Sequence, residues 1–415
     1  MVSIAHRHSP EDFGAARLAR LKARRRVWLQ VHLWLGLTAG AVLALIGLTG
    51  SVLVFWQELD AWLSPGQFRV SAPAESASYR PLDEIVAAAR TGAPPGAEPG
   101  FVYYPEGPED VFTFFFDKPG ATVGESDTLN VSVNPYTARV TGTRVFYSGT
   151  SYFDNCLMGF IFKLHYALLW KEGGVVLVGG IGVLLVVSVL SGLILWWPLT
   201  GQWLNALTIK RRASAERFNF DLHKTFGFYS TLVLLAVLVS GVYMNLPEQV
   251  VWLVERVSKV NPLDEFHSTV LTGSTPIGLG RAVENARASY PLGRLRFLNL
   301  PSSPEGVYQI CGQGGDELAR YVLDTRCVSI DQYTGAVLQV TDPAHGSGGD
   351  VFIQWQWPLH SGQAFGMTGR LLVFASGLAC PVLFVTGIIR WRQKKRAARA
   401  GIERRQTRQA AGAMP

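Results

Sequence analysis

The chain has 415 residues, of which 48% are hydrophobic and 17% are charged, and its mean hydropathy is positive. This composition favours an integral membrane protein with two or three domains. The formal net charge of +7 is concentrated in segments that flank apolar runs, which argues against nucleic-acid binding and for contact with membrane lipid.

Four uncharged runs are long enough to cross a bilayer, which takes about 20 apolar residues. They contain 30, 25, 23 and 19 residues and lie at 27–56, 173–197, 225–247 and 371–389. The first run is too long and too uniform for a cleaved signal peptide, so we expect it to remain as an anchor.

Lysine and arginine residues indicate how these spans are oriented. The segments 1–26, 198–217 and 390–415 together hold 20 basic and four acidic residues, whereas 58–157 and 248–357 hold 14 basic and 25 acidic residues. We therefore expect the basic segments, and with them both termini, on the cytoplasmic side. The two acidic loops are expected outside.

The sequence carries a weak internal duplication. The segment "VSVNPYTARV" begins at Val131 and "VSIDQYTGAV" begins at Val328, an offset of 197 residues. Each predicts a strand, a turn at the Tyr-Thr pair and a second strand. A helix-like stretch precedes each of them, "LDEIVAAAR" from Leu82 and "GLGRAVENARASY" from Gly278. Each outer loop is thus expected to form a small α+β module.

The expected fold is membrane α-helical, a four-helix transmembrane bundle built from a duplicated half, with two small α+β modules outside the membrane. In chain order we expect a basic cytoplasmic tail (1–26), a first span (27–57), the first module (58–157), a second span with a preceding interfacial segment (158–197), a cytoplasmic loop (198–217), a third span (218–247), the second module (248–357), a fourth span (358–391) and a basic cytoplasmic tail (392–415).

Two of the four cysteines, Cys311 and Cys327, lie in strand-like segments of the second outer loop. An oxidising compartment permits a disulfide there, and the sequence leaves the pairing open. No C-x-x-C-H motif occurs, so covalent c-type haem attachment is not indicated.

Four histidines lie at the ends of the spans, at two expected depths. His32 lies six residues after Arg26, and His223 lies six residues after Arg217. Six helical residues rise about 9 Å, so we expect both rings at one depth near the cytoplasmic face. His165 and His360 precede the second and fourth spans from the outer side, which gives a second pair near the other face.

Two facing imidazoles between membrane helices are suited to bind a haem iron axially. We therefore predict two b-type haems, one held by His32 and His223 and one held by His165 and His360. Zinc is the alternative metal, but the histidines lack H-E-x-x-H or cysteine-rich spacing. The basic residues near the pairs are candidate partners of haem propionates: Lys224, Lys163, Lys171 and Arg370.

The alternation of four spans with modules containing "NPYTARVTG" and "DQYTGAVLQV" resembles the PepSY-associated transmembrane-helix family, over residues 24–396. That family includes the FoxB- and PiuB-like ferric-siderophore reductases, which are iron-regulated proteins of the bacterial inner membrane. The resemblance implies a multi-pass inner-membrane protein that passes electrons to a ferric siderophore in the periplasm. The segments "QVHLWLG", "FKLHYAL", "DLHKTFG" and "PLHSGQ" match the positions at which such reductases hold two b-type haems.

The electron donor is not identified by the sequence. No G-x-G-x-x-G follows a predicted strand and no Walker A motif occurs, so a quinol or a separate cytoplasmic reductase is expected to supply electrons. Reduction of a bound ferric chelate requires no proton-transfer residue, and we assign no general acid or base. A homo-oligomer is compatible with the sequence.

Two alternatives remain open. A non-enzymatic membrane scaffold or regulator would use the modules to bind a peptide or a partner protein, and it would carry no chromophore. A transporter is less consistent with four spans whose interiors hold no paired charges.

Overall fold

The computed structural model describes residues 10–73, 78–120, 126–198, 201–210, 212–261, 266–271, 273–313, 325–342 and 345–412. The chain divides into two compact units. The first unit comprises Met1–Ser51, Gly179–Val242 and Leu372–Pro415, and the second comprises Val52–Val178 and Tyr243–Leu371.

Long apolar helices make up the first unit. Within the described residues, three helices are long and apolar enough to cross a membrane, in segments Lys171–Trp196, Ala215–Asn245 and Gln363–Thr407. They belong to α7 (Lys171–Trp196), α9 (Ala215–Asn245) and α13 (Gly366–Gly412). The bent pair α1 (Pro10–Thr38) and α2 (Gly40–Leu53) supplies a fourth span if it is counted as one. The chain is therefore a multi-pass membrane protein.

The first span differs from the continuous segment expected at 27–57. It bends by 59° between α1 and α2, at the turn residue Ala39. A Cβ placed on Gly40 would lie 2.9 Å from the Phe384 ring on α13, so a glycine is needed where the backbone passes that ring. Helix α2 then packs closely on α13, where Ser51 donates a 2.9 Å hydrogen bond to the Phe374 carbonyl. Small residues of this kind allow membrane helices to approach.

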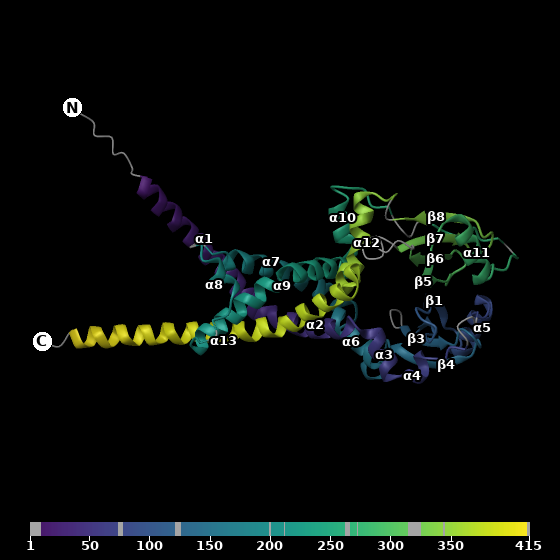
Figure 1. Ribbon diagram of the computed structural model, residues 1–415, viewed down its shortest axis with the longest axis horizontal. Coiled ribbons are helices and arrows are strands. Elements are labelled where there is room, and N and C mark those ends of the chain that lie inside the picture. Colours follow the sequence, from purple (N-terminus) through teal and green to yellow (C-terminus); the bar gives the residue numbers. More distant parts are fainter. Residues whose placement is uncertain are drawn as a thin grey trace, which may run out of the picture. The chain divides into compact units, whose positions relative to one another are not determined.

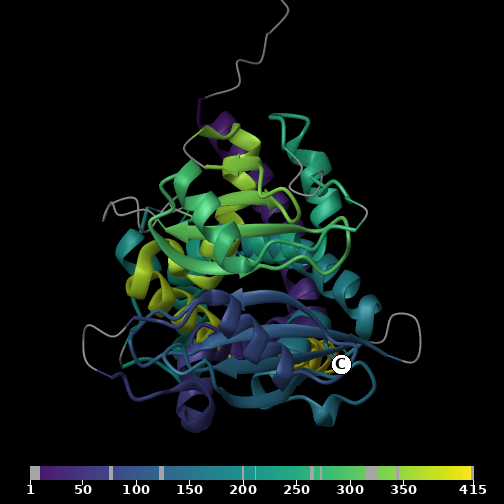
Figure 2. The ribbon, with the colours of Figure 1, turned by 90° about the vertical axis from the view of Figure 1, so that its right-hand side faces the viewer.

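A single antiparallel sheet dominates the second unit, and Figure 2 shows the strands of its two halves. The strand order is β4-β3-β2-β1-β5-β6-β7-β8. The strands are β1 (Glu98–Tyr103), β2 (Phe112–Pro119), β3 (Ser126–Val133), β4 (Val140–Tyr147), β5 (Arg294–Asn299), β6 (Val307–Gln313), β7 (Thr325–Asp331) and β8 (Val337–Thr341). The two α+β modules are therefore joined edge to edge through β1 and β5, with Tyr103 opposite Phe297.

One face of this sheet forms a hydrophobic core with α5 (Leu82–Gly92) and α11 (Leu279–Ser289). Alternate residues of the strands point into it, as the period of two requires. In β2 the buried side chains are Phe112, Phe114 and Phe116, and each fully buried ring contributes about 1.5–3 kcal/mol relative to exposure. Asp83 of the first module accepts a hydrogen bond from the Gly280 N–H of the second, which ties the two modules together at the start of α11.

Shorter helices lie between the sheet and the spans in the sequence: α3 (Trp56–Leu63), α4 (Pro65–Phe68), α6 (Leu157–Ala167), α10 (Pro247–Val254) and α12 (Gly348–Ser361), with α8 (Trp203–Leu207) between α7 and α9. Two short 3-10 turns, η1 (Tyr152–Asp154) and η4 (Gln363–Phe365), complete the connections. The buried Asp60 of α3 forms a bidentate ion pair with Arg144 of β4 and so fixes α3 to the first module. Such a pair is costly to break because either partner alone would be a buried charge.

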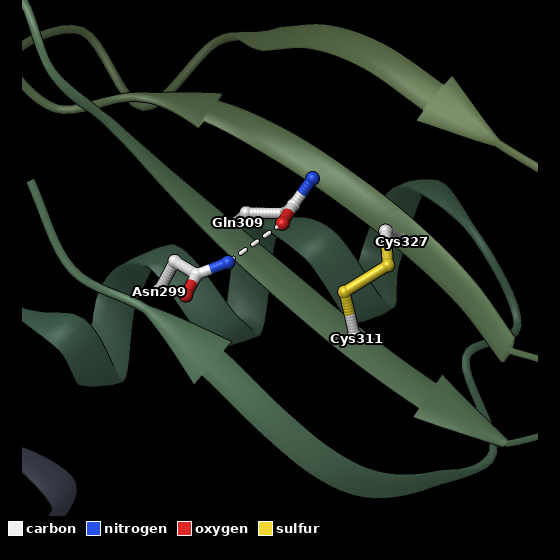
Figure 3. Close-up of a disulfide and its surroundings, with 4 residues drawn as sticks. All are labelled: Asn299, Gln309, Cys311 and Cys327. Carbon is white, nitrogen blue, oxygen red and sulfur yellow. Dashed lines mark hydrogen bonds between the residues drawn. A yellow bond between two sulfur atoms is a disulfide. The ribbon is translucent and has the colours of Figure 1, made fainter. Parts of the chain in front are cut away.

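The cysteine pairing that the sequence left open is present as a disulfide between Cys311 on β6 and Cys327 on β7 (Figure 3). The two residues are directly opposite each other in the strand register, and Asn299 donates a 2.7 Å hydrogen bond to Gln309 close by. The bridge links neighbouring strands of the second module, across a sequence separation of 16 residues.

Candidate functional site

The first histidine pair, His32 and His223, is brought together within the first unit. His32 lies on α1 and His223 lies on α9. Their ring centroids are 6.2 Å apart and their planes are inclined by 78°. These helices come from different halves of the duplicated sequence, so the fold places equivalent residues of the two halves opposite each other.

His32 is oriented by residues of α7. Its Nδ1 lies 2.9 Å from the Ser188 carbonyl oxygen and 3.2 Å from the Ser191 hydroxyl oxygen. A carbonyl oxygen can only accept, so Nδ1 carries the proton and Nε2 keeps its lone pair. A Cβ at Gly192 would lie 3.0 Å from Cε1 of the imidazole, so this glycine makes room for the ring.

His223 is oriented in the same way by α13. Its Nδ1 lies 2.9 Å from the Thr386 hydroxyl oxygen, and a Cβ at Gly387 would lie 3.4 Å from its Cε1. A hydroxyl residue followed by glycine thus holds each ring of the first pair. These two pairs lie 26 residues after His165 and His360, a repeated spacing through which the sequence could have indicated them.

This arrangement fits the axial ligation of one iron. A metal–imidazole nitrogen bond is about 2.0–2.1 Å long, so two rings on opposite faces of one iron have centroids roughly 6 Å apart. Imidazoles can also pack edge to face at such a distance without a metal. The hydrogen bonds at Nδ1 favour the metal-binding interpretation, because metal-ligating histidines usually use their second ring nitrogen as a donor.

The second pair, His165 and His360, lies within the second unit. His165 is close to the C-terminal end of α6, and His360 is next to the last residue of α12. Their ring centroids are 6.0 Å apart and their planes are inclined by 69°. The two pairs therefore have nearly the same separation, although the helices that carry them differ in length and position.

Helix breaks position the second pair. Helix α6 ends before α7 begins, and the joint uses left-handed backbone conformations at Leu168 and Leu169. A Cβ at Gly174 would lie 1.8 Å from the Ala167 carbonyl oxygen, so the chain can fold back this closely only at a glycine. Each histidine thus lies on a short helix that is separate from the long helix following it.

A second close approach follows His360. Helix α12 ends at Gly362, which has a φ of +77°, and a Cβ there would lie 2.7 Å from the backbone of Gly369. Only glycine combines this φ with this approach, so the "HSGQAFGMTG" stretch is shaped by its glycines.

The basic residues considered as propionate partners have other partners in the structure. Lys224 donates a 2.9 Å hydrogen bond to the buried Asp221 and also bonds the Asn205 and Thr208 carbonyls. Arg370 pairs with Glu58 at 2.6 Å. Ion pairing within the protein therefore explains these two residues. The Arg370–Glu58 pair is set by tertiary packing, whereas Asp221 and Lys224 are three residues apart on α9, a spacing that the sequence already shows.

Lys163 lies over the rings of Tyr147 and Tyr166. These cation–π contacts hold its ammonium group on α6, the helix that carries His165. Lys171 lies at the start of α7.

An aromatic cluster covers the other face of the first module, next to α6. Phe115 of the "VFTFFF" segment points away from the core and contacts Phe146, whose ring lies 6.0 Å from Phe162 of α6. Tyr103 belongs to the same cluster, and burial raises its pKa to about 12. The segment is thus half core strand and half packing surface for the helix that carries His165.

Among the side chains that the structure describes, no group of three or more histidine, cysteine, aspartate or glutamate residues could hold a metal ion. A tetrahedral zinc site of protein ligands therefore has no counterpart in those residues. A haem needs only two axial protein ligands, which is the number of imidazoles in each histidine pair.

Comparison with protein-family models matches residues 29–394 to the family described as the PepSY-associated TM region. This match includes the eight strands of the sheet and the four histidines of the two pairs. No curated protein matches the chain.

Proposed function

We propose that this chain, which belongs to the PepSY-associated TM region family, is a dihaem b-type reductase of the bacterial inner membrane. Its His32–His223 and His165–His360 pairs would each hold one haem b. In this proposal electrons enter on the cytoplasmic side and leave to a ferric siderophore in the periplasm, where Fe(III) becomes Fe(II) and is released.

The observation that supports this proposal best is the repetition of one geometry. Both histidine pairs have centroid separations near the value for bis-imidazole ligation, 6.2 and 6.0 Å. Two pairs carried by different helices thus share the separation that two imidazoles bound to one metal would have. Haem, when bound, supplies reversible one-electron chemistry at its iron.

The roles of the chain's own residues follow from their contacts. Ser188 and Thr386 each accept a hydrogen bond from Nδ1–H of their histidine. This fixes the tautomer in which Nε2 keeps its lone pair and can bind a metal. Gly192 and Gly387 make room for the two rings. The α+β modules are proposed to present the ferric chelate, since the charge pattern of the sequence places them outside the membrane on the periplasmic side.

The substrate class comes from the resemblance to ferric-siderophore reductases. Siderophores bind Fe(III) through hard oxygen donors, and these hold Fe(II) less strongly. One electron transferred to the bound chelate therefore releases the metal without a proton-transfer residue. This agrees with our assignment of no general acid or base.

A visible spectrum of the purified full-length protein tests the proposal. We expect a Soret band that shifts and sharpens on addition of dithionite, and reoxidation of the reduced protein on addition of a ferric siderophore. A folded, colourless protein would instead favour the alternative function, a membrane scaffold or regulator whose modules bind a peptide or partner protein.

A further inference from the structure

Helix α13 continues far beyond its apolar segment. It runs without a break from Gly366 to Gly412, and Figure 1 shows it as one long helix to the C-terminal end. The part from Arg390 onward holds nine basic residues and one acidic residue. Its 22 residues beyond Arg390 rise about 33 Å, so the basic part is a rod that extends from the end of a membrane span.

Only the first part of this rod is close enough to the membrane for its charges to interact with lipid headgroups. The polar region on each side of a bilayer is roughly 5–8 Å thick, and charges are screened over about 8 Å at physiological salt. Arg399 lies nine residues beyond Arg390, which corresponds to about 14 Å along the helix axis. Arg404 and Arg405 lie about 21 Å or more beyond it. Arg404 and Arg405 therefore lie outside the reach that explains a basic flank of a span, and Arg399 lies at its limit.

The same three side chains are exposed and form no ion pair with the residues that the structure describes. The neighbouring residues are mostly alanine, glutamine, lysine and arginine, which are strong helix formers, so the rod can keep its shape in water. A rigid helix with unpaired positive charges is a surface for a negatively charged partner.

Both basic ends continue helices that reach the first histidine pair: α1 carries His32, and α13 contacts His223. Thr386 and Gly387, which contact His223, lie three or four residues before Arg390 on α13. His32 lies on α1, whose Arg24, Arg25 and Arg26 are one to two turns away along the same helix. A partner bound to these charges is therefore brought to the end of the bundle that holds this pair.

We infer that the C-terminal basic part of α13 is the docking surface for a soluble, acidic protein that carries one electron at a time, and that this protein is the electron donor. This inference rests on the proposed function. The reduced carrier is oxidised by one electron, the site held by His32 and His223 gains that electron, and no bond is formed or broken. Weak, salt-sensitive electrostatic encounters are typical of electron-transfer partners.

Binding of a purified acidic flavodoxin to the full-length protein in zwitterionic nanodiscs tests the inference. The variant R399Q/R404Q/R405Q removes the three distal charges, and R139Q/K259Q/R287Q removes three exposed charges from the second unit as a matched control. Because an exposed charge pair is worth about 0.2–1 kcal/mol, we expect roughly tenfold weaker binding for the distal variant at low salt. The control variant should bind as the unaltered protein does, and added salt should remove the difference.

Equal binding by the two variants would overturn the inference. So would a distal variant that loses affinity only for vesicles containing anionic lipid, or an unaltered protein that binds an RNA oligonucleotide more tightly than the flavodoxin. The binding measurement does not depend on a chromophore in the membrane protein. A colourless protein that still binds the carrier through the distal charges would therefore contradict the proposed function and leave the docking surface intact.

Discussion

Nδ1 of His223 lies 2.9 Å from the hydroxyl oxygen of Thr386. The Thr386 hydroxyl itself donates to the carbonyl oxygen of Val382, 2.6 Å away. Because a hydroxyl has a single proton, its oxygen must accept from Nδ1–H, and the imidazole is left with its lone pair at Nε2. A threonine one turn from the end of a span thus sets the tautomer of a ring on another helix.

Replacing Thr386 by valine should weaken the first site without changing the shape of the side chain. Loss of a hydrogen-bond partner of a ligating histidine typically costs 10–100-fold in metal affinity. The imidazole also becomes a weaker electron donor, so we expect the midpoint potential of this haem to rise. Redox titration of the purified variant measures the midpoint potential, and its haem content measures the loss of affinity. Thr231→Val is a matched control, because the Thr231 hydroxyl bonds the Gly227 carbonyl of its own helix.

Adding one methyl group beside His32 should displace its ring. In Gly192→Ala the new Cβ would lie 3.0 Å from Cε1, closer than ordinary contact, so the imidazole must shift. We expect lower haem content and an altered spectrum for one of the two haems. Gly180→Ala, on the same helix, places a methyl group where no atom lies within 4 Å, and it should bind haem normally. Equal spectra for the two variants would show that His32 is not an axial ligand.

The two Tyr-Thr turns differ at one position, and the difference should be measurable as stability. Ala138 has a φ of 52°, and its counterpart Gly335 has a φ of 71°. The left-handed conformation costs a residue with a Cβ about 1–2 kcal/mol, so Ala138→Gly should raise the free energy of unfolding of the modules by about 1 kcal/mol. Gly335→Ala should lower it by more, because its Cβ would also lie 2.5 Å from the Asn285 amide nitrogen. Thermal unfolding of the full-length protein in detergent tests both signs.

The second turn should also depend on pH. Burial alone raises the pKa of Asp331, but N–H groups of Thr334, Thr269 and Tyr333 donate to its carboxylate and hold its pKa below the usual value. A lowered folded-state pKa contributes stability that is complete above the unfolded value, about 3.9, and is lost as the pH falls through the folded value. We therefore expect the second module to become protease-sensitive below about pH 4.

An internal comparison makes this test specific. The first turn uses Asn134, whose side-chain oxygen accepts from the Tyr136 and Thr137 N–H groups and carries no charge. Cleavage should therefore begin in the second module on acidification, and Asp331→Asn should remove most of the pH dependence. Simultaneous opening of both modules in the unaltered protein would argue against Asp331 as the cause.

The sequence predicted those features that repeat or that have a strong local pattern. The apolar runs, the helices at Leu82 and Leu279 and the Tyr-Thr turns follow from local composition and periodicity. The pairing of His32 with His223 followed from their equal spacing from Arg26 and Arg217, which predicted one depth for both rings. Their role as haem ligands remains a prediction.

Features set by tertiary contacts could not be predicted. The pairing of β1 with β5 joins segments almost 200 residues apart, and any edge strand would have satisfied the local pattern. The ion pair of Arg370 with Glu58 likewise joins residues far apart in the sequence. Ser191 on α7 contacts His32 on α1, and this contact between two spans of the same half follows from helix packing rather than from a sequence pattern.

The number of haems per chain, measured on the purified protein and on single histidine variants, tests the central claim most directly. We predict two b-type haems per chain, loss of the same haem in His32→Ala and His223→Ala, and loss of the other in His165→Ala and His360→Ala. A protein without haem, or a haem lost together by His32→Ala and His165→Ala alone, would contradict the account.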